Sequence, residues 1–360
     1  MSALLIRLGK FFDGIRYRFV SVIRPSLARD KKVPRVMFGF GPRGGSAAIL
    51  KAAKLKVLFG NAVYDNNLLY ICSGNIPLWY CKKEKGRGVK IVVNQNGVFY
   101  PAWYGQKYQE ANEKHLLGHY QLADFIIYQS RFCRESAEIY LGKAPCASDV
   151  IYNPVDSDYF RPPAQIKFSL DHAVLLTTGI FYSEVRQDRL KLLLECFVLL
   201  RKEYPDIRLV IAGSLTESLH KEAQKMIENN AVQRHVKILR SYDYKTAPLI
   251  YGMGDIYINT QFNDSCPSGV LEAMSSGLPV VYLDCGGTPE LVGNAGVGVK
   301  VQKSWEVSEY PKPEDVKKAV LGVVKGYEDY SRRARQRCVE IFDQKIWKRR
   351  HEEIFTRILR

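Results

Sequence analysis

The 360-residue sequence lacks the patterns that mark several large classes of protein. Its eight cysteines are scattered singly with no C-x-x-C pair, so neither a zinc ribbon nor a redox motif is indicated. No run of about 18 uncharged apolar residues occurs, so a membrane-spanning helix is not expected. The first residues have no clean apolar core and no small-residue cleavage site, so they do not resemble a signal peptide. We therefore expect free, mostly buried thiols in a reducing cytoplasm.

The composition is that of a globular protein with one unusual property, its charge. Hydrophobic residues make up 46% and charged residues 25%, and the length predicts about two domains. The net charge of +16 favours anionic partners such as nucleic acid, an anionic membrane surface or phosphate-bearing small molecules. A nucleic-acid partner is not expected, because the sequence has no recognised nucleic-acid-binding module.

Residues 1–32 are basic and amphipathic. Leu4, Leu8, Phe11 and Phe19 lie near helical spacing, with several arginines and lysines between them. One interpretation is a helix that lies in the plane of an anionic membrane, and the other is a helix packed on its own domain.

From Val33 onward, short apolar runs rich in β-branched residues alternate with helical stretches. This alternation predicts an α/β protein with doubly wound parallel sheets. It stops in a proline-bearing segment near residues 160–169 and then restarts, so we expect a first domain at 33–165 and a second at 166–340. Because doubly wound sheets bind ligands beyond the carboxyl ends of their strands, the loops after strands should hold the chemistry.

The loop "NDSCPSGVLEAMSSG" combines two carboxylates with a predicted helix start. Ser268 is expected to be the N-cap, and Gly269 would present backbone N–H groups to an anion such as a diphosphate. Asp264 and Glu272 would repel that anion unless they bind hydroxyl groups, as the acidic residue of dinucleotide folds binds ribose. The pattern favours a nucleotide-sugar pocket, and the alternative is a capped core helix with solvated acids.

The run from Asp264 to Val292 resembles the donor-site signature of the family 4 retaining glycosyltransferases, also called glycosyl transferases group 1. In that signature a glutamate, seven residues and a second glutamate precede "AM..G.PVV" and "GG.PELV". Asp264 stands at the first glutamate and Glu272 at the second. The stretch "VIYNPVDSDYF" resembles the family's segment before the second domain, with Pro154 in place of a glycine. The resemblance extends from about Val33 to the end of the chain.

The resemblance implies a GT-B fold, in which two doubly wound parallel-sheet domains face each other across a cleft and a last helix, here 341–360, crosses back to the first domain. It implies retaining transfer of a sugar from a nucleotide diphosphate sugar to a hydroxyl of a glycan or lipid-linked acceptor, without metal or other cofactor. Asp264 would contact the donor sugar and Glu272 the ribose. The residues expected to line the sugar and phosphate are Gly179, Cys266, Pro267, Ser268 and Gly269.

Two positions depart from the family pattern. Ile180 stands where the family has an arginine that stabilises the departing diphosphate, and we expect Arg186 and Lys191 to supply that charge. The alternative is that these two side chains are only solvated residues at a helix start. Asn96 stands where a histidine is common. These departures leave open a catalytically weakened protein that binds nucleotide sugars or acts as an assembly partner.

The first domain should hold the acceptor. Gly44 and Gly45, in a glycine-rich turn after a strand, are expected on the diphosphate or acceptor side together with Asn96. The aromatic residues Phe99 and Trp103 are either an acceptor platform or packing. A GT-B epimerase is a further alternative, but it needs acid and base residues that the sequence does not place. We expect the protein in the cytoplasm, with peripheral attachment to the inner face of the membrane.

Overall fold

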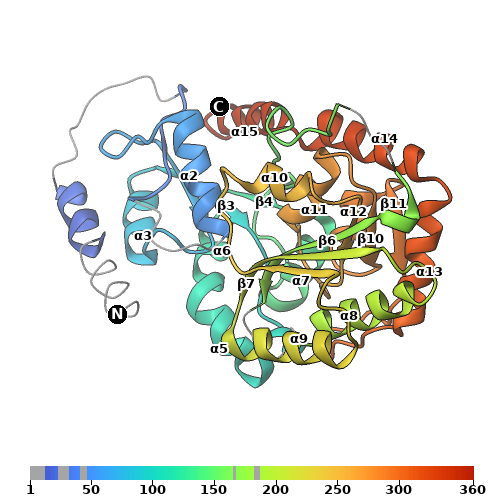
Figure 1. The fold of residues 1–360 in the computed structure, drawn as a ribbon. Helices are drawn as coiled ribbons and strands as arrows, with labels where there is room; N and C mark the ends of the chain where they lie inside the picture. Colours follow the sequence, from blue (N-terminus) through green and yellow to red (C-terminus); the bar gives the residue numbers. More distant parts are fainter. Residues whose placement is uncertain (1–12, 23–31, 41–46, 165–167, 182–186) are drawn as a thin grey trace. The chain divides into compact units, whose positions relative to one another are not determined.

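The computed structural model describes residues 13–22, 32–40, 47–164, 168–181 and 187–360 (Figure 1). The chain divides into two compact units: unit 1 contains residues 1–152 and 348–360, and unit 2 contains residues 153–347. The division therefore falls before the proline-bearing segment and not within it. One reason is that Val155 pairs with Asp343 and that Ser157 Oγ donates a hydrogen bond to the Asp343 carboxylate, so this segment is tied to unit 2.

Unit 1 is built on a five-stranded parallel sheet in the order β1-β2-β3-β4-β5. The strands are β1 Val36–Met37, β2 Leu68–Cys72, β3 Lys90–Gln95, β4 Phe125–Tyr128 and β5 Ser148–Val150. Every residue of β2 and β4 is buried, which is typical of parallel strands covered on both faces. The helical elements after β1 are α2 Ala47–Phe59, α3 Leu78–Gly86, α4 Pro101–Tyr104, a 3-10 turn Gly105–Lys107, α5 Tyr108–Asn112, a π-helical turn Glu113–Leu117, α6 Gly118–Leu122 and α7 Arg131–Leu141.

Unit 2 is built on a six-stranded parallel sheet in the order β11-β10-β9-β6-β7-β8. The strands are β6 Val174–Phe181, β7 Arg208–Leu215, β8 Val236–Leu239, β9 Ile256–Asn259, β10 Val280–Leu283 and β11 Gly296–Val299. The helical elements are a 3-10 turn Leu170–His172, α8 Gln187–Arg201, α9 Glu217–Asn229, α10 Ala247–Tyr251, α11 Ser268–Ser275, α12 Thr288–Val292, α13 Pro313–Val324, α14 Tyr327–Arg337 and a π-helical turn Cys338–Phe342. In Figure 1, strands β6 and β7 lie between α8 and α9 on one side and α10 and α11 on the other.

The last helix, α15 Gln344–Ile358, begins in unit 2, and its residues 348–358 belong to unit 1. There its side chains reach the sheet: His351 is fully buried, its Nε2 lies 2.8 Å from the hydroxyl of Tyr70 on β2, and Phe355 packs edge-on against Tyr70. The predicted fold class, two doubly wound α/β domains with a final helix that returns to the first, is confirmed.

The described residues include every cysteine of the chain and so test the expectation about the thiols. All eight cysteines are free, and all except the half-buried Cys146 are buried, as predicted. Burial raises the pKa of several of these thiols, for example that of Cys72 to about 12, which keeps them protonated and unreactive. Within the described ranges, none of the helices combines the length and apolar character that a bilayer span requires.

Candidate active site

The loop between β9 and α11 brings the predicted donor residues together at the carboxyl end of the unit 2 sheet. Helix α11 begins at Ser268, and its N-cap is Pro267, with no side-chain cap bond. The expectation that Ser268 is the N-cap is therefore wrong: Ser268 is the first helical residue, and its side chain is exposed. A helix start without a side-chain cap keeps first-turn N–H groups available for an anion.

Gly269 lies at the first turn of α11, against the ends of two strands. A Cβ atom at this position would lie 2.7 Å from the hydroxyl of Tyr257 on β9 and 2.8 Å from Oγ1 of Thr178 on β6. Real side chains do not approach that closely, so the helix start can pack this deeply only because residue 269 is a glycine.

Glu272 is held by a chain of buried hydroxyl groups. The Tyr251 hydroxyl donates to Glu272 Oε2 over 2.7 Å and lies 3.0 Å from Thr178 Oγ1, which lies 2.9 Å from the Tyr257 hydroxyl. Burial first, and then the negative charge of Glu272, raise the pKa of Tyr251 well above its usual value. The phenol therefore stays protonated and fixes one carboxylate oxygen of this half-buried glutamate.

Asp264 belongs to a loop that is fastened to the turn after β10. Its Oδ1 accepts a hydrogen bond from the backbone N–H of Cys266 over 3.0 Å, and its carbonyl oxygen accepts one from Gly287 N over 2.7 Å. Gly286 has φ +69°, and a Cβ there would lie 2.6 Å from the Asp264 carbonyl oxygen. The Gly286–Gly287 pair thus lets the two loops touch, which explains why the pair follows the acidic loop in the sequence.

Cys266 faces away from the loop surface. Its side chain is 4% exposed; its Sγ accepts a hydrogen bond from the backbone N–H of Asn153, and its carbonyl oxygen accepts one from the Asn153 side chain. These contacts fasten the loop at Cys266 to the segment at Asn153.

The structure does not test the role of the two cations that we expected beside the departing diphosphate. Arg186 lies outside the described residues. Lys191 is exposed and lies 3.9 Å from the carboxylate of Glu195 one turn later, while Ile180, in the arginine position, is 41% exposed. The role of Arg186 and Lys191 therefore stays a prediction.

A different cation, Arg189, is buried at the carboxyl end of β6; it is one of the cations that follow Ile180 in the sequence, where we expected Arg186 and Lys191 to act instead. It is 2% exposed; its guanidinium donates to Thr178 O over 3.2 Å and to Gln261 Oε1 over 2.9 Å, and it lies 4.5 Å from the centre of the Phe181 ring. A Cβ on Gly179 would lie 3.1 Å from Nη2 of Arg189, so the predicted donor-site glycine lies directly against this cation. The sequence does indicate that Arg189 is buried. It lies four residues before Leu193 and eight before Phe197, so it falls on the apolar face of α8.

In unit 1, Asn96 belongs to a polar cluster at the ends of β2, β3 and β4. The Lys51 ammonium donates to Asn96 Oδ1 over 2.6 Å, to Asn94 Oδ1 over 3.0 Å and to Gln129 Oε1 over 3.1 Å. Asn96 in turn donates to the Ser73 hydroxyl over 2.6 Å. Sequence reasoning gave Asn96 but not Lys51, because a single lysine in a helix has no local signature.

The other predicted residues of unit 1 are partly described. Gly44 and Gly45 lie outside the described residues. The rings of Phe99 and Trp103 stack with centroids 5.6 Å apart and planes at 17°, and Trp103 is 42% exposed. The half-buried Phe99 and the exposed Trp103 thus form a stacked pair, and their role as an acceptor platform stays a prediction.

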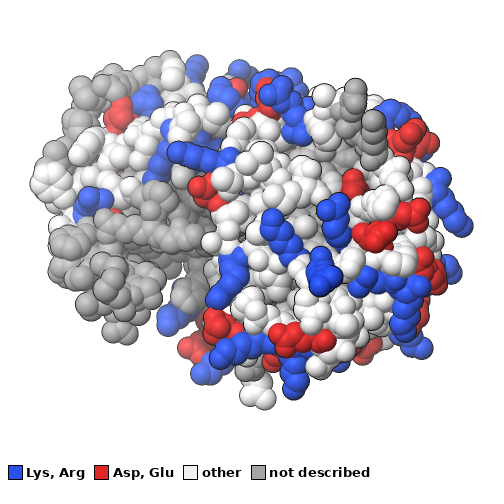
Figure 2. Space-filling view, in the orientation of Figure 1, with Lys and Arg blue, Asp and Glu red and all other residues white. Residues whose placement is uncertain are grey.

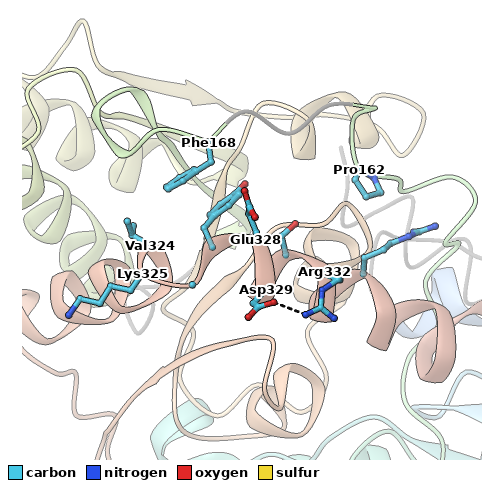
Figure 3. A pocket seen from close by; sticks show the side chains of 11 residues that line it. Pro162, Phe168, Val324, Lys325, Glu328, Asp329 and Arg332 are labelled. Atoms are coloured by element: carbon cyan, nitrogen blue, oxygen red, sulfur yellow. Dashed lines mark hydrogen bonds and ion pairs between the residues drawn. The ribbon is translucent and has the colours of Figure 1, made fainter.

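A cavity of about 800 Å³ lies elsewhere in unit 2, at the start of α14 (Figure 3). Phe168 and Tyr327 stack at its wall with centroids 3.8 Å apart, and Asp329 accepts a hydrogen bond from Arg332 at its rim. None of the residues that line it belongs to the predicted donor site. Its charged side chains carry both signs and favour no single ligand charge: Lys325, Glu328, Asp329, Arg332 and Arg335.

Comparison with known proteins agrees with the site in unit 2. The family model described as "Glycosyl transferases group 1" matches residues 168–337, which is almost all of unit 2. This match confirms the family resemblance predicted from the run Asp264 to Val292.

Curated relatives match about half of the chain. The phosphatidylinositol N-acetylglucosaminyltransferase GPI3 subunit of Saccharomyces cerevisiae is 26% identical over 176 residues, which cover 48% of this chain and 38% of that protein. The corresponding gpi3 subunit of Schizosaccharomyces pombe is 26% identical over 167 residues, which cover 46% of this chain and 35% of that protein. The matched segment thus spans little more than a third of these relatives.

Solved structures share the fold over most of the chain. A glycosyltransferase from Rickettsia africae matches with a TM-score of 0.64 and 17% identity, covering 88% of this chain and 84% of that one. Anabaena Alr3699/HepE, solved in complex with UDP and glucose, matches with a TM-score of 0.65 and 16% identity, covering 88% and 85%.

Proposed function

Because residues 168–337 form a domain of the group 1 glycosyltransferase family, we propose that this protein transfers a sugar from a nucleotide diphosphate sugar to a hydroxyl group of an acceptor. The observation that carries the proposal is the pairing of an α11 start that has no side-chain cap with Glu272, four residues further along the same helix. The helix start suits the diphosphate, and the carboxylate suits the ribose hydroxyls.

In the proposed mechanism the chain binds and orients the donor. Asp264, with one oxygen occupied by the loop backbone, offers its second carboxylate oxygen to a sugar hydroxyl. The buried Arg189 places a positive charge at the end of β6, where it favours negative charge that develops on the departing diphosphate. The departing phosphate oxygen would take the acceptor proton on the same face of the sugar, so the anomeric configuration would be retained and no metal would be needed.

For the acceptor we propose a glycan or a lipid-linked hydroxyl, with the protein attached peripherally to an anionic membrane on its cytoplasmic side. Two curated relatives act, by their names, on phosphatidylinositol, and the net charge of +16 favours an anionic surface. The exposed Trp103, stacked on the half-buried Phe99, offers an apolar face of the kind on which sugar rings pack.

The test is the substitution Glu272→Ala, with Glu222→Ala on the exposed face of α9 as the matched control. Loss of a charge-assisted hydrogen bond costs about 1.5–3 kcal/mol, so donor affinity should fall roughly ten- to a hundred-fold. The measurement is a thermal-shift titration with UDP-, GDP- and ADP-sugars, followed by an assay of transfer and donor hydrolysis.

The same experiment separates the second candidate, a nucleotide-sugar binder without activity. That candidate is motivated by Ile180 in the arginine position, and it would show a donor-dependent thermal shift with neither transfer nor hydrolysis. Full donor binding by the Glu272→Ala protein would reject both versions of the site.

A further inference from the structure

The helix at residues 13–22 buries one face and exposes another. Its inner face carries Tyr17 and Val20, each 2% exposed; the Tyr17 ring lies 4.9 Å from that of Tyr80 on α3. Lys83 of α3 donates a hydrogen bond to the Ser21 hydroxyl over 3.1 Å. The helix is therefore fixed on unit 1 by packing and by hydrogen bonds, and its outer face is a defined surface.

That outer face is apolar. Ile15, Phe19 and Val22 are 48%, 58% and 80% exposed, and their spacing of four and three residues puts them in one row. Trp79, 44% exposed, lies one turn before Lys83 on α3, so it is on the side of α3 that adjoins this helix. Such a row is unusual on a free surface, since large apolar side chains at successive turns of a helix usually face a core.

The flanks of the row are cationic. At 100° per residue, Arg16 and Arg18 fall on opposite sides of the row. Exposed Lys82, Lys83 and Arg87 follow on α3. The two acids described in these elements are each paired with an arginine: Asp13 with Arg16 over 3.7 Å, and Glu84 with Arg87 over 2.9 Å.

This arrangement differs from the general basic character of the protein. On the face shown in Figure 2, the described Lys and Arg side chains are interspersed with Asp and Glu, as on an ordinary solvated surface. At helix 13–22 the cations border an exposed apolar row, which is the pattern of a helix that lies in a membrane interface.

We propose that Ile15, Phe19, Val22 and Trp79 form a docking surface that inserts into the interface of an anionic lipid membrane, with Arg16, Arg18 and Lys82 on its lipid phosphates. An anionic bilayer satisfies both halves of the surface, because apolar side chains enter the acyl boundary while cations stay at the head groups. A protein partner would need a matching acidic groove, and a second copy of this chain would bring the same cations face to face. The inference gives the membrane association proposed above a location, and it rests on that part of the proposed function only.

The test uses the full chain and flotation with vesicles of phosphatidylcholine alone or with about 30% phosphatidylserine. Wild type should float with the anionic vesicles. The double variant Phe19→Glu/Val22→Glu should lower the partition coefficient roughly tenfold or more, because it puts charge into the acyl boundary. Leu249→Glu, at a position 67% exposed on α10, is the matched control and should float as wild type does.

A spectroscopic readout makes the surface specific. Tryptophan emission should shift to the blue on binding and be quenched by brominated lipids. Of the four tryptophans, Trp79 is the one on the docking surface, so Trp79→Phe should remove most of that change. Equal flotation of the double variant and wild type would overturn the proposal. The proposal would also be overturned if light scattering showed that wild type is an oligomer without lipid and that the double variant is a monomer. The row would then be an interface between copies of this chain.

Donor-dependent thermal shifts measured on the same variants keep the two proposals apart. A double variant that no longer floats but binds donor normally supports the docking surface. Failure of donor binding in every protein, including wild type, would reject the proposed sugar transfer and leave the flotation result standing.

Discussion

At the strand ends of unit 2, a helix start without a side-chain cap lies beside Glu272, whereas at the strand ends of unit 1 the Lys51 ammonium is enclosed by three amide oxygens. Unit 2 thus presents groups suited to a diphosphate and to hydroxyls. In unit 1 the charge of Lys51 is bound by side chains of the same unit. The groups at the strand ends there are neutral, and they include the Asn96 amide and the Ser73 hydroxyl.

The difference agrees with where the family match lies. The family model covers residues 168–337 and so does not extend into unit 1. Donor chemistry is shared among proteins that use nucleotide sugars, so its residues recur in a recognisable pattern. Acceptor chemistry differs from protein to protein, so we expect the residues that select the acceptor in unit 1, which the family model does not match.

The largest effect that would sharpen this comparison is expected from Arg189→Met. The substitution keeps the apolar stem but removes the guanidinium donor from the buried Thr178 O and from the half-buried Gln261 Oε1, which should cost about 2–5 kcal/mol of stability. We expect a clear fall in the unfolding midpoint of unit 2 and, in the remaining folded protein, weaker diphosphate binding and slower transfer.

The matched control is Lys191→Met on the same helix, where the side chain is 58% exposed and its ion pair with Glu195 is a surface one. Its stability should change by less than about 0.5 kcal/mol. If transfer falls in Lys191→Met while stability holds, the diphosphate charge comes from Lys191, as the sequence predicts, and Arg189 is structural.

A smaller effect is expected from Lys51→Met in unit 1. The amide oxygens of Asn94, Asn96 and Gln129 lose a donor, so we expect a loss of about 1–3 kcal/mol. Donor-dependent thermal shifts should stay at the wild-type level, while the KM for the acceptor should rise. A variant that loses donor binding as well would contradict the division of roles between the units.

The fold could be predicted almost entirely from the sequence because its signals are local. Ten of the eleven described strands coincide with an apolar run that the sequence shows plainly, whereas β11 reads Gly-Val-Gly-Val and is recognisable only through its pairing with β10. Helix α3 was missed because its lysine-rich sequence shows no amphipathic pattern.

The site could be predicted where one loop carries it and not where distant segments meet. Asp264 and Glu272 share a single motif, so spacing was enough. Tyr251 and Thr178, which hold Glu272, are 73 residues apart and look like ordinary core residues in the sequence. Arg189 could have been found, because an arginine on an apolar helix face must acquire buried partners.

The smallest effect, and the sharpest test of the hydroxyl chain, is expected from Tyr251→Phe. The substitution removes the donor to Glu272 Oε2 and leaves the ring packing in place, so one oxygen of Glu272 loses its fixed position. A neutral hydrogen bond contributes about 0.5–1.5 kcal/mol, and we expect donor affinity to fall by roughly three- to ten-fold with kcat little changed.

Titration of the donor and of its 2′-deoxyribose analogue gives the measurement. Wild type should discriminate between the two, and Tyr251→Phe should discriminate less, because a loosely held carboxylate gains less from the 2′ hydroxyl. Tyr159→Phe, whose hydroxyl donates to the exposed backbone of Lys245, is the matched control and should leave both affinities unchanged. Equal discrimination by wild type and Tyr251→Phe would mean that Glu272 keeps its position without the hydroxyl chain. The close packing of α11 at Gly269 would then be enough to shape the donor site of unit 2.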